Sequence, residues 1–496
     1  MAGLAEQERD RRAHAAFRRS LAAGDPRSGA TCLVARADAR ALMGDVGFMV
    51  DSVSRFLHVL DSLDERRLAT DLRLLRGGSL IAPGLLQLAR EDLGRSMEYA
   101  RVLADTVLEF WSAVNLAQAL YASGDPTAAF RPARRGIALG QHLSDAERAV
   151  GIALEGDILS GQGNWQQAAV KYDSSARMSL RARFDGGAAH AMELQGSMAM
   201  RLRDWGTADS VLQEAARTIA GEGYGGNVAL LNYLLASVAL QRGRPAQARA
   251  HLRDASRGVV DDGNLLYFIR AREAEVRWRE GDLDGAARLL HQASDAMDRY
   301  RATLTHRDAR LTAFEGSPDD TDPDAGIASI IAALVVSGRA RDGLEIAERS
   351  RARELLSRLS SSAVARDTGR HNAPPSTGAT PMPSSGGTTR LVQQALPRDV
   401  ALVEYVVGRG GEPTSVFLLT RDTLRGFVTT PVDSLEEPIA RLRATLEGNG
   451  SARVVAATLG AALLHAVAAH IPAHVTSLVL VPDGAVHRVP FDVLPL

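Results

Sequence analysis

A helical repeat built around small residues is the feature of this sequence that most constrains its fold. Between residues 105 and 360, six predicted helix–turn–helix units recur, and one turn residue anchors each unit. The anchors are Gly124, Gly163, Arg203, Gly243, Gly281 and Gly338. Small residues follow the anchors by five and twelve positions: Ala129 and Gly136, Ala168 and Ser175, Ala208 and Ala215, Ala248 and Ala255, Ala286 and Ala293, Gly343 and Ser350. Positions seven apart share one helix face, so small side chains there let neighbouring helices approach closely and stack.

Bulky apolar residues complete the pattern of the units. Trp111, Leu116 and Leu120 lie in the first helix of one unit, and Trp165 and Trp205 follow the turns of later units. This arrangement resembles a tetratricopeptide-repeat (TPR) solenoid, which implies a mostly α-helical array that binds a protein or peptide partner on its surface. The first five anchors are 38 to 40 residues apart. Because the usual TPR period is about 34 residues, we expect longer helices or loops here.

The segments that flank the array follow other patterns. Within residues 1–104, helical periodicity without the regular small residues occurs at 30–42, 47–63, 68–75 and 83–103, and we expect the whole of 1–104 to consist of degenerate or capping repeats. The acidic segment 316–324, within the last interval of the 105–360 array, predicts a polar loop. Residues 361–390 are rich in Ser, Gly, Pro and Thr. They predict a disordered linker, because such a segment buries too little apolar surface to offset its ordering entropy.

A change of hydrophobic period predicts a second domain in residues 391–496. Residues 400–407, 415–420 and 423–428 are three predicted strands, and residues 434–446 and 453–469 are two predicted helices. A fourth strand, residues 478–481, is wholly apolar, which predicts burial on both faces. This order predicts an α/β domain in which the last strand lies parallel to an earlier one after a helical crossover.

The C-terminal residues carry the second resemblance. Pro482, Asp483 and Gly484 predict a turn with positive φ at the glycine, residues 486–489 predict an extended piece, and Pro490 predicts the first position of a helix. Together with residues 402–405 and 416–419, this stretch resembles the N-terminal part of CHAT domains. These are caspase-like and separase-like cysteine peptidase modules that commonly follow TPR arrays. The helix at residues 344–359 resembles the one that closes such arrays.

The CHAT resemblance implies a catalytic His and Cys downstream of the segment that begins with Pro490 and Phe491, beyond Leu496. We therefore assign no catalytic residue and expect the chain as given to be inactive. Cys32, the single cysteine, occupies a small apolar position on a predicted helix. His487 lies beside a turn, which predicts a structural role.

Three further patterns predict no ligand chemistry. His465, His470 and His474 straddle a helix end without a neighbouring Cys or acidic cluster, so we expect no metal. Residues 221–226 match G-x-G-x-x-G but lie between helices, which predicts a loop and no dinucleotide cofactor. Arg349, with the arginines at 351 and 353, predicts a solvated helix with internal ion pairs; a role in ligand binding remains the alternative.

Composition excludes several other classes of function. The 496-residue chain has a formal net charge of -1, so it has no general attraction to nucleic acid or to an anionic membrane. The longest apolar run, residues 327–336, is about half of the length that spans a bilayer. A single cysteine excludes an intrachain disulfide, and the N-terminal residues lack the apolar region of a secretory signal. These features predict a cytoplasmic protein.

Two functions remain open from the sequence. In the first, the chain is the sensor and N-terminal sheet of a CHAT cysteine endopeptidase, and its repeats bind a protein partner that regulates the protease domain. In the second, it is a non-catalytic TPR scaffold for protein–protein interaction.

Overall fold

The computed structural model describes residues 2–42, 45–62, 64–81, 85–220, 225–259, 264–303, 326–351, 388–408, 411–429, 435–448 and 452–495. Contacts divide the chain into two compact units. The first unit contains Met1–Arg272 and Asp295–Pro323, and the second contains Glu273–Ser294 and Asp324–Leu496. The division passes through two helices, α14 (Asn264–Arg279) and α15 (Leu283–Thr303).

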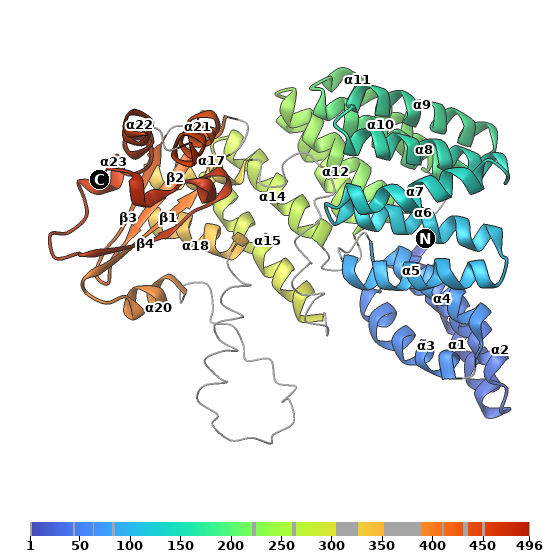
Figure 1. Cartoon of the computed structure of the whole chain (residues 1–496). Coiled ribbons are helices and arrows are strands. Elements are labelled where there is room, and N and C mark those ends of the chain that lie inside the picture. Colours follow the sequence, from blue (N-terminus) through green and yellow to red (C-terminus); the bar gives the residue numbers. More distant parts are fainter. Residues whose placement is uncertain are drawn as a thin grey trace. The chain divides into compact units, whose positions relative to one another are not determined.

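The first unit is a stack of helices in which each helix packs against the next along the chain (Figure 1). Its helices are α1 (Ala2–Ala22), α2 (Pro26–Leu42), α3 (Val53–Ser62), α4 (Arg66–Ser79), α5 (Leu86–Val102), α6 (Thr106–Ala122), α7 (Pro126–Gly140), α8 (Asp145–Gly161), α9 (Trp165–Arg181), α10 (Asp185–Arg201), α11 (Trp205–Thr218), α12 (Gly225–Gln241) and α13 (Pro245–Gly258). A short π-helical turn, Phe48–Ser52, precedes α3. The architecture is a TPR-like α-solenoid, as the repeat pattern predicts. The sequence analysis did not identify α1.

The turn anchors share one backbone conformation. All six lie in the left-handed region, with φ from 58° at Arg203 to 87° at Gly281. Glycine reaches this region without steric cost because it has no Cβ, whereas Arg203 reaches it against the usual preference of L-residues. The predicted small residues are buried at every position whose side chain is described; Ser350 lies outside that set. Close helix approach through small residues is therefore confirmed.

The second unit contains a four-stranded sheet with helices on both sides. Its strands are β1 (Val400–Val406), β2 (Thr414–Leu419), β3 (Leu424–Thr429) and β4 (Ser477–Val481), and its helices beyond α14 and α15 are α17 (Ile327–Val336), α18 (Ala340–Arg351), α20 (Thr388–Ala395), α21 (Glu436–Glu447), α22 (Arg453–Leu463) and α23 (His465–Ala468). The strand order is β3-β2-β1-β4. β1 and β2 are antiparallel, as are β2 and β3, whereas β1 and β4 are parallel. The predicted α/β order and its helical crossover are confirmed.

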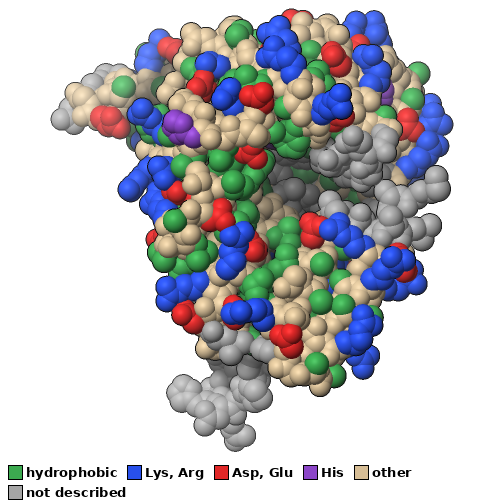
Figure 2. Space-filling view, turned by 90° about the vertical axis from the view of Figure 1, so that its right-hand side faces the viewer, with side chains coloured by type: hydrophobic (Ala, Val, Ile, Leu, Met, Phe, Trp, Pro, Cys, Tyr) green, Lys and Arg blue, Asp and Glu red, His purple; other side chains and the backbone are tan. Residues whose placement is uncertain are grey.

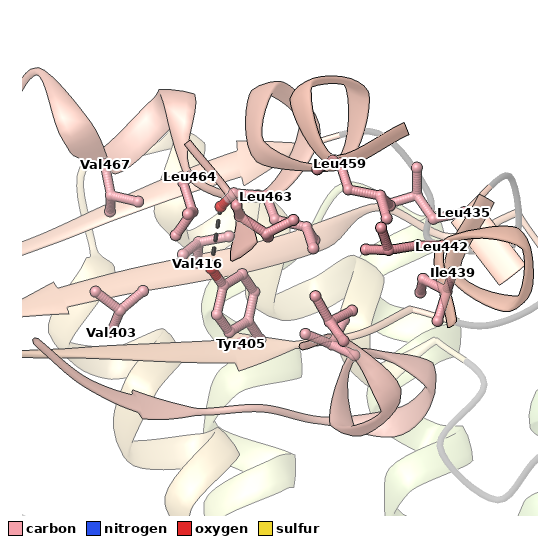
Figure 3. Close-up of a cluster of buried hydrophobic side chains, with 14 of the residues drawn as sticks. Val403, Tyr405, Val416, Leu435, Ile439, Leu442, Leu459, Leu463, Leu464 and Val467 are labelled. Atoms are coloured by element: carbon pink, nitrogen blue, oxygen red, sulfur yellow. Dashed lines mark hydrogen bonds between the residues drawn. The ribbon is translucent and has the colours of Figure 1, made fainter. Parts of the chain in front are cut away.

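One face of the sheet packs against α21, α22 and α23. Side chains from β1 and β2 meet leucines from these helices in a common hydrophobic core (Figure 3). Tyr405 is completely buried there, and its hydroxyl donates a 3.0 Å hydrogen bond to the carbonyl oxygen of Leu463. This bond satisfies a polar group that would otherwise be costly to bury.

The opposite face of the sheet packs against α17 and α18, the last helix pair of the predicted repeats. Gly426 in β3 allows this approach, because a Cβ there would lie 2.9 Å from the Cβ of Ala340. Glu412, in the β1–β2 loop, also ties this pair to the sheet. Its Oε1 accepts hydrogen bonds from the backbone N of Gly326 (2.7 Å) and from the hydroxyl of Ser329 (2.8 Å). A carboxylate at this position stabilises the N-terminus of α17.

The structure corrects the prediction for β4. This strand lies at an edge of the sheet, and its residues alternate between exposed and half-buried; Val479 is 45% exposed. The strand that is buried on both faces is β2, which lies between β1 and β3. An apolar run alone does not distinguish a central strand from an edge strand.

Smaller predictions had mixed outcomes. Gly484 has φ of 50°, as the predicted turn requires, and the Asp483 carboxylate accepts a 2.7 Å hydrogen bond from the backbone N of Val407. Residues 486–489 are not extended, because Gly484–Arg488 forms a 3-10 turn. α20 begins at Thr388, within the segment predicted as linker. Residues 304–325 and 352–387, which include the predicted acidic loop and most of the linker, lie outside the described residues.

Candidate functional site

The first helices of three successive pairs form a shared surface in the first unit. α8 contacts α6 before it and α10 after it, in addition to its contacts with α7 and α9. In Figure 1, α8 and α10 lie below their partners α9 and α11. We call the surface shared by α6, α8 and α10 the inner face.

Asp157 is the central polar group of this inner face. The hydroxyl of Tyr172, in α9, donates a 2.7 Å hydrogen bond to Asp157 Oδ1. Tyr172 is 1% exposed, and its ring packs onto Gly156: a Cβ at Gly156 would lie 2.6 Å from Tyr172 Cε1. The missing side chain at Gly156 therefore creates the space through which the tyrosine reaches the carboxylate.

Tyr121, from α6, lies one helical turn along α8 from Asp157. Its ring packs against Gly161, where a Cβ would lie 3.3 Å from Tyr121 Cε1. Positions 157 and 161 share one face of α8, because residues four apart on a helix are neighbours. Burial and the negative charge of Asp157 together raise the pKa of Tyr121 to about 12, so its phenol stays neutral at physiological pH.

α10 contributes His190 and Glu193 to the same surface. Nδ1 of His190 lies 3.6 Å from a carboxylate oxygen of Glu193, and the two side chains are 46% and 14% exposed. The surrounding protein alone would lower the pKa of His190, but the charges of Glu193 and Asp157 raise it above its ordinary value. The imidazole is therefore more readily protonated than a free histidine.

Desolvation dominates the electrostatics of Asp157. The surrounding protein raises the pKa of this carboxyl to about 6, although the Tyr172 hydrogen bond and the charge of His190 both lower it. Its side chain nevertheless keeps partial access to solvent.

Four other shielded carboxylates of the first unit are neutralised by arginine. The pairs are Asp10 with Arg36 and Arg40, Asp92 with Arg76, Glu109 with Arg101 and Arg135, and Asp209 with Arg242. Within the part of the chain that the structure describes, Asp157 has no ion pair with Arg or Lys. The inner face thus presents a carboxylate whose cationic neighbour in the described residues is a titratable histidine, His190, and not an arginine or lysine.

Cys32 and His487 belong to different compact units. Cys32 is a partly buried free thiol on α2, in the first unit. His487 is exposed on the 3-10 turn after β4, in the second unit. The structural roles predicted for these two residues stay predictions.

The three histidines near the end of the crossover form no site in the described residues. His465, His470 and His474 are all exposed, and the ring of His470 packs 4.9 Å from that of Phe427. No group of three potential metal ligands was found among the residues that the structure describes.

The arginines near Arg349 and the glycine-rich segment 221–226 are described only in part by the structure. Arg349 lies near His291, with Nη1 3.4 Å from the imidazole Nδ1. The side chains of the arginines at 351 and 353 and most of the glycine-rich segment 221–226 lie outside the described residues. α12 begins at Gly225, so the last two glycines of that segment start a helix.

Sequence reasoning missed the residues around Asp157. A carboxylate or a tyrosine within a helical repeat ordinarily indicates a solvated face or a core position. Spacing from the turn anchors could nevertheless have pointed to Asp157. The residues six positions before the first five anchors are Gln118, Asp157, Ser197, Ser237 and Glu275, and all are polar. Alignment of the units on their anchors would have predicted a polar surface on the first helices.

Charge on the molecular surface is mixed in sign. Figure 2 shows arginine and carboxylate side chains interspersed over the face that it presents, with hydrophobic side chains gathered along the middle. Among the described residues on this face, we see no broad basic patch of the kind that binds nucleic acid. Among the described helices, none is long and apolar enough to cross a bilayer.

No protein-family model and no curated protein matches this chain. Among solved structures, it is similar to a Rap protein complexed with Competence and Sporulation Factor, with 14% identity, coverage of 70% of this chain and 99% of the other, and a TM-score of 0.43. The apo form of RapI is similar with 9% identity, coverage of 73% and 99%, and a TM-score of 0.41. BtubC from P. vanneervenii is similar with 18% identity, coverage of 43% and 92%, and a TM-score of 0.37. Likeness at this level assigns no function to this chain.

Proposed function

We propose that this chain is the sensor and scaffold part of a CHAT-type cysteine endopeptidase, and that the inner face of its solenoid binds a peptide segment of a regulating partner protein. The observation that carries the binding role is the accessible cluster around Asp157. Its two tyrosines are held in place by packing on Gly156 and Gly161, and Asp157 itself has no ion pair with Arg or Lys in the described residues. Preorganised polar groups that remain accessible are suited to binding a ligand.

The stacked helices make such a surface long enough for an extended or helical peptide. Neighbouring first helices contact one another from α6 to α10, so their exposed positions form one continuous strip. Solenoids commonly bind partners along such a surface, because each repeat adds a few contact positions.

Support for the peptidase part comes from the sheet and its sequence. The antiparallel pair β1–β2 includes residues 402–405 and 416–419, and β4 precedes the Pro-Asp-Gly turn that motivated the CHAT resemblance. α17 and α18 pack directly on this sheet, and Glu412 bonds to the start of α17. A helix pair that follows the repeat pattern therefore belongs to the α/β unit and packs directly on its sheet.

Hydrogen–deuterium exchange tests the binding role. Peptides that bind the purified full chain would first be selected from a displayed library of random sequences. Exchange would then be measured with and without the tightest peptide. We expect slower exchange in α6, α8 and α10. Protection confined to the outer helices α7, α9 and α11, or to the α/β unit, would contradict the proposal.

The peptidase role requires a separate assay. The purified chain would be incubated with a mixed pool of peptides, with and without a thiol-blocking reagent. We expect no thiol-dependent cleavage, because the resemblance assigns neither catalytic residue to this chain. Cleavage that is lost on Cys32→Ser would contradict the assignment. The second candidate, a non-catalytic TPR scaffold, is favoured if the inner face binds peptide but binding leaves exchange in β1 and β2 unchanged.

A further inference from the structure

We propose that the inner face binds a cationic side chain of its peptide partner, an arginine guanidinium or a lysine ammonium, against the carboxylate of Asp157. This inference rests on the proposed function, because it specifies the chemistry of the peptide that the inner face takes. Three features of the cluster carry it: an unbalanced charge, an adjacent aromatic ring, and access for a ligand.

The unbalanced charge is the first feature. Asp157 Oδ1 accepts the hydrogen bond from Tyr172, and the described part of the chain supplies no donor to Oδ2. A carboxylate that has lost water and shares only a titratable imidazole with a second carboxylate carries a free-energy cost. The chain resolves the same problem at Asp92 and Glu109 with arginines of its own. At Asp157, a cation of the peptide partner would supply this counter-charge.

The groups that surround Asp157 leave the site negative at neutral pH. Tyr121 from α6 and Tyr172 from α9 are neutral phenols, and α10 provides Glu193 and His190. Glu193 adds a second carboxylate, which the neighbouring imidazole neutralises only in part. Because opposite charges attract most strongly where water is displaced, a cation gains more here than at an open surface.

The aromatic ring is the second feature. Tyr121 packs on Gly161, one helical turn from Asp157, so a planar cation that bonds the carboxylate can also lie against a ring. The same unit already contains such a contact, in which the Arg201 guanidinium lies 5.6 Å from the centre of the Trp165 ring. Guanidinium combines a planar face with paired N–H donors, so we expect arginine to bind more tightly than lysine.

Access is the third feature. Asp157 and Tyr121 are partly solvent-accessible, and His190 is 46% exposed. A side chain from a peptide on the inner face can therefore reach the carboxylate without opening the helix stack. Tyr172 packs on Gly156 and Tyr121 packs on Gly161, so both rings are held in place while Asp157 keeps its solvent access.

The test compares peptide selection by the full-length protein and by its D157N variant. A displayed library of random peptides would be selected on each protein. We expect the unmodified protein to enrich peptides that share an arginine or lysine at one aligned position. The D157N variant should lose that preference. Asparagine can still accept the Tyr172 hydrogen bond, and thermal unfolding would verify that the variant is folded.

Affinity measurements then isolate the contact. Fluorescence anisotropy would measure binding of the best peptide and of its Arg→Gln or Lys→Gln form. We expect either the D157N change or the peptide change to weaken binding by at least about tenfold. The two changes together should weaken it little further, because they remove the same contact. Glu155→Gln is the matched control: Glu155 lies on the same helix but is paired with Lys171, so its loss should leave affinity unchanged.

The outcomes separate this inference from the function on which it rests. If the unmodified protein enriches no peptide, the proposed peptide-binding function fails. If it enriches peptides without a shared basic residue, or if the peptide change to glutamine leaves affinity unchanged, the cation site alone is overturned. The peptide change needs no protein variant, so the result stands even if D157N does not fold. Comparison of the arginine and lysine forms of one peptide identifies which cation the site prefers.

Discussion

The hydroxyl of Tyr172 donates a 2.7 Å hydrogen bond to Oδ1 of Asp157, and the tyrosine reaches it by packing on Gly156. The bond favours the ionised carboxylate, yet burial raises the pKa of Asp157 to about 6. Asp157 therefore changes charge close to neutral pH, unlike an ordinary aspartate. Four predictions follow from this pair and from other features of the fold.

Stability should fall as the pH rises through the range in which Asp157 ionises. The pKa is about 6 in the folded protein against 3.8 for an unperturbed aspartate, so the folded state binds more protons between these values. Ionisation as the pH rises between these two values then costs about 1–2 kcal/mol of unfolding free energy, allowing for partial solvent screening. The raised pKa of His190 acts in the same direction, because its stabilising charge is lost as the pH rises.

Denaturant unfolding at a series of pH values between about 4 and 7 would measure this effect. We expect the D157N variant to show a shallower decline in unfolding free energy than the unmodified protein. An identical pH dependence in both proteins would show that Asp157 does not titrate in this range.

Two Gly→Ala substitutions inside helices should have opposite effects. At Gly156 the new Cβ would meet the Tyr172 ring at 2.6 Å, so we expect a loss of about 1–3 kcal/mol from overpacking. At Gly94, in α5, a new Cβ meets nothing within 4 Å. Alanine should there raise stability by up to about 1 kcal/mol through helix propensity. Equal thermal shifts for the two variants would contradict the packing argument.

The Arg203→Gly variant should be more stable than the unmodified protein. Its φ is 58°, and a left-handed conformation costs an L-residue about 1–2 kcal/mol. Arg203→Gly should therefore raise the unfolding free energy by about 1 kcal/mol. Gly243→Ala is the reverse experiment at the equivalent turn, where φ is 70° and a Cβ would meet nothing within 4 Å. We expect thermal unfolding to move upward for the first variant and downward for the second.

A charge on β4 should reduce self-association. β4 is an edge strand, and the apolar Val479 is 45% exposed on it. Unprotected edges of this kind pair with other chains, and natural edge strands are often blocked by lysine. Val479→Lys should therefore reduce concentration-dependent association in analytical ultracentrifugation. Val454→Lys removes a more exposed valine, 80% accessible, from α22 and should have no such effect.

Local rules predicted the elements of this fold well. A single spacing rule located the turns, because a left-handed residue must end each first helix and small residues must face the neighbouring helix. The strands were recognised from their period, and Pro482–Gly484 from turn chemistry. The position of β4 at an edge could not be predicted, because it depends on strand order, which the apolar run 478–481 does not encode.

The candidate site was less predictable than the fold. Asp157 acquires its properties from Tyr172, fifteen residues away, and from Tyr121 and His190 on neighbouring helices. None of these residues is unusual in sequence, and only stacking brings them together. Conversely, Cys32 and His487 attract attention in the sequence but lie in separate compact units.

The hydrogen bond to Glu412 determines when α17 can complete its folding during synthesis. The backbone N of Gly326 at the start of α17 bonds to this carboxylate, which lies 86 residues later in the chain. At ribosomal rates of about 5–20 residues per second, on the order of ten seconds separate the synthesis of the two groups. During that interval α17 exists without its cap and without the sheet on which it packs. The last helix pair of the array therefore completes its folding only after β1 and β2 have left the ribosome.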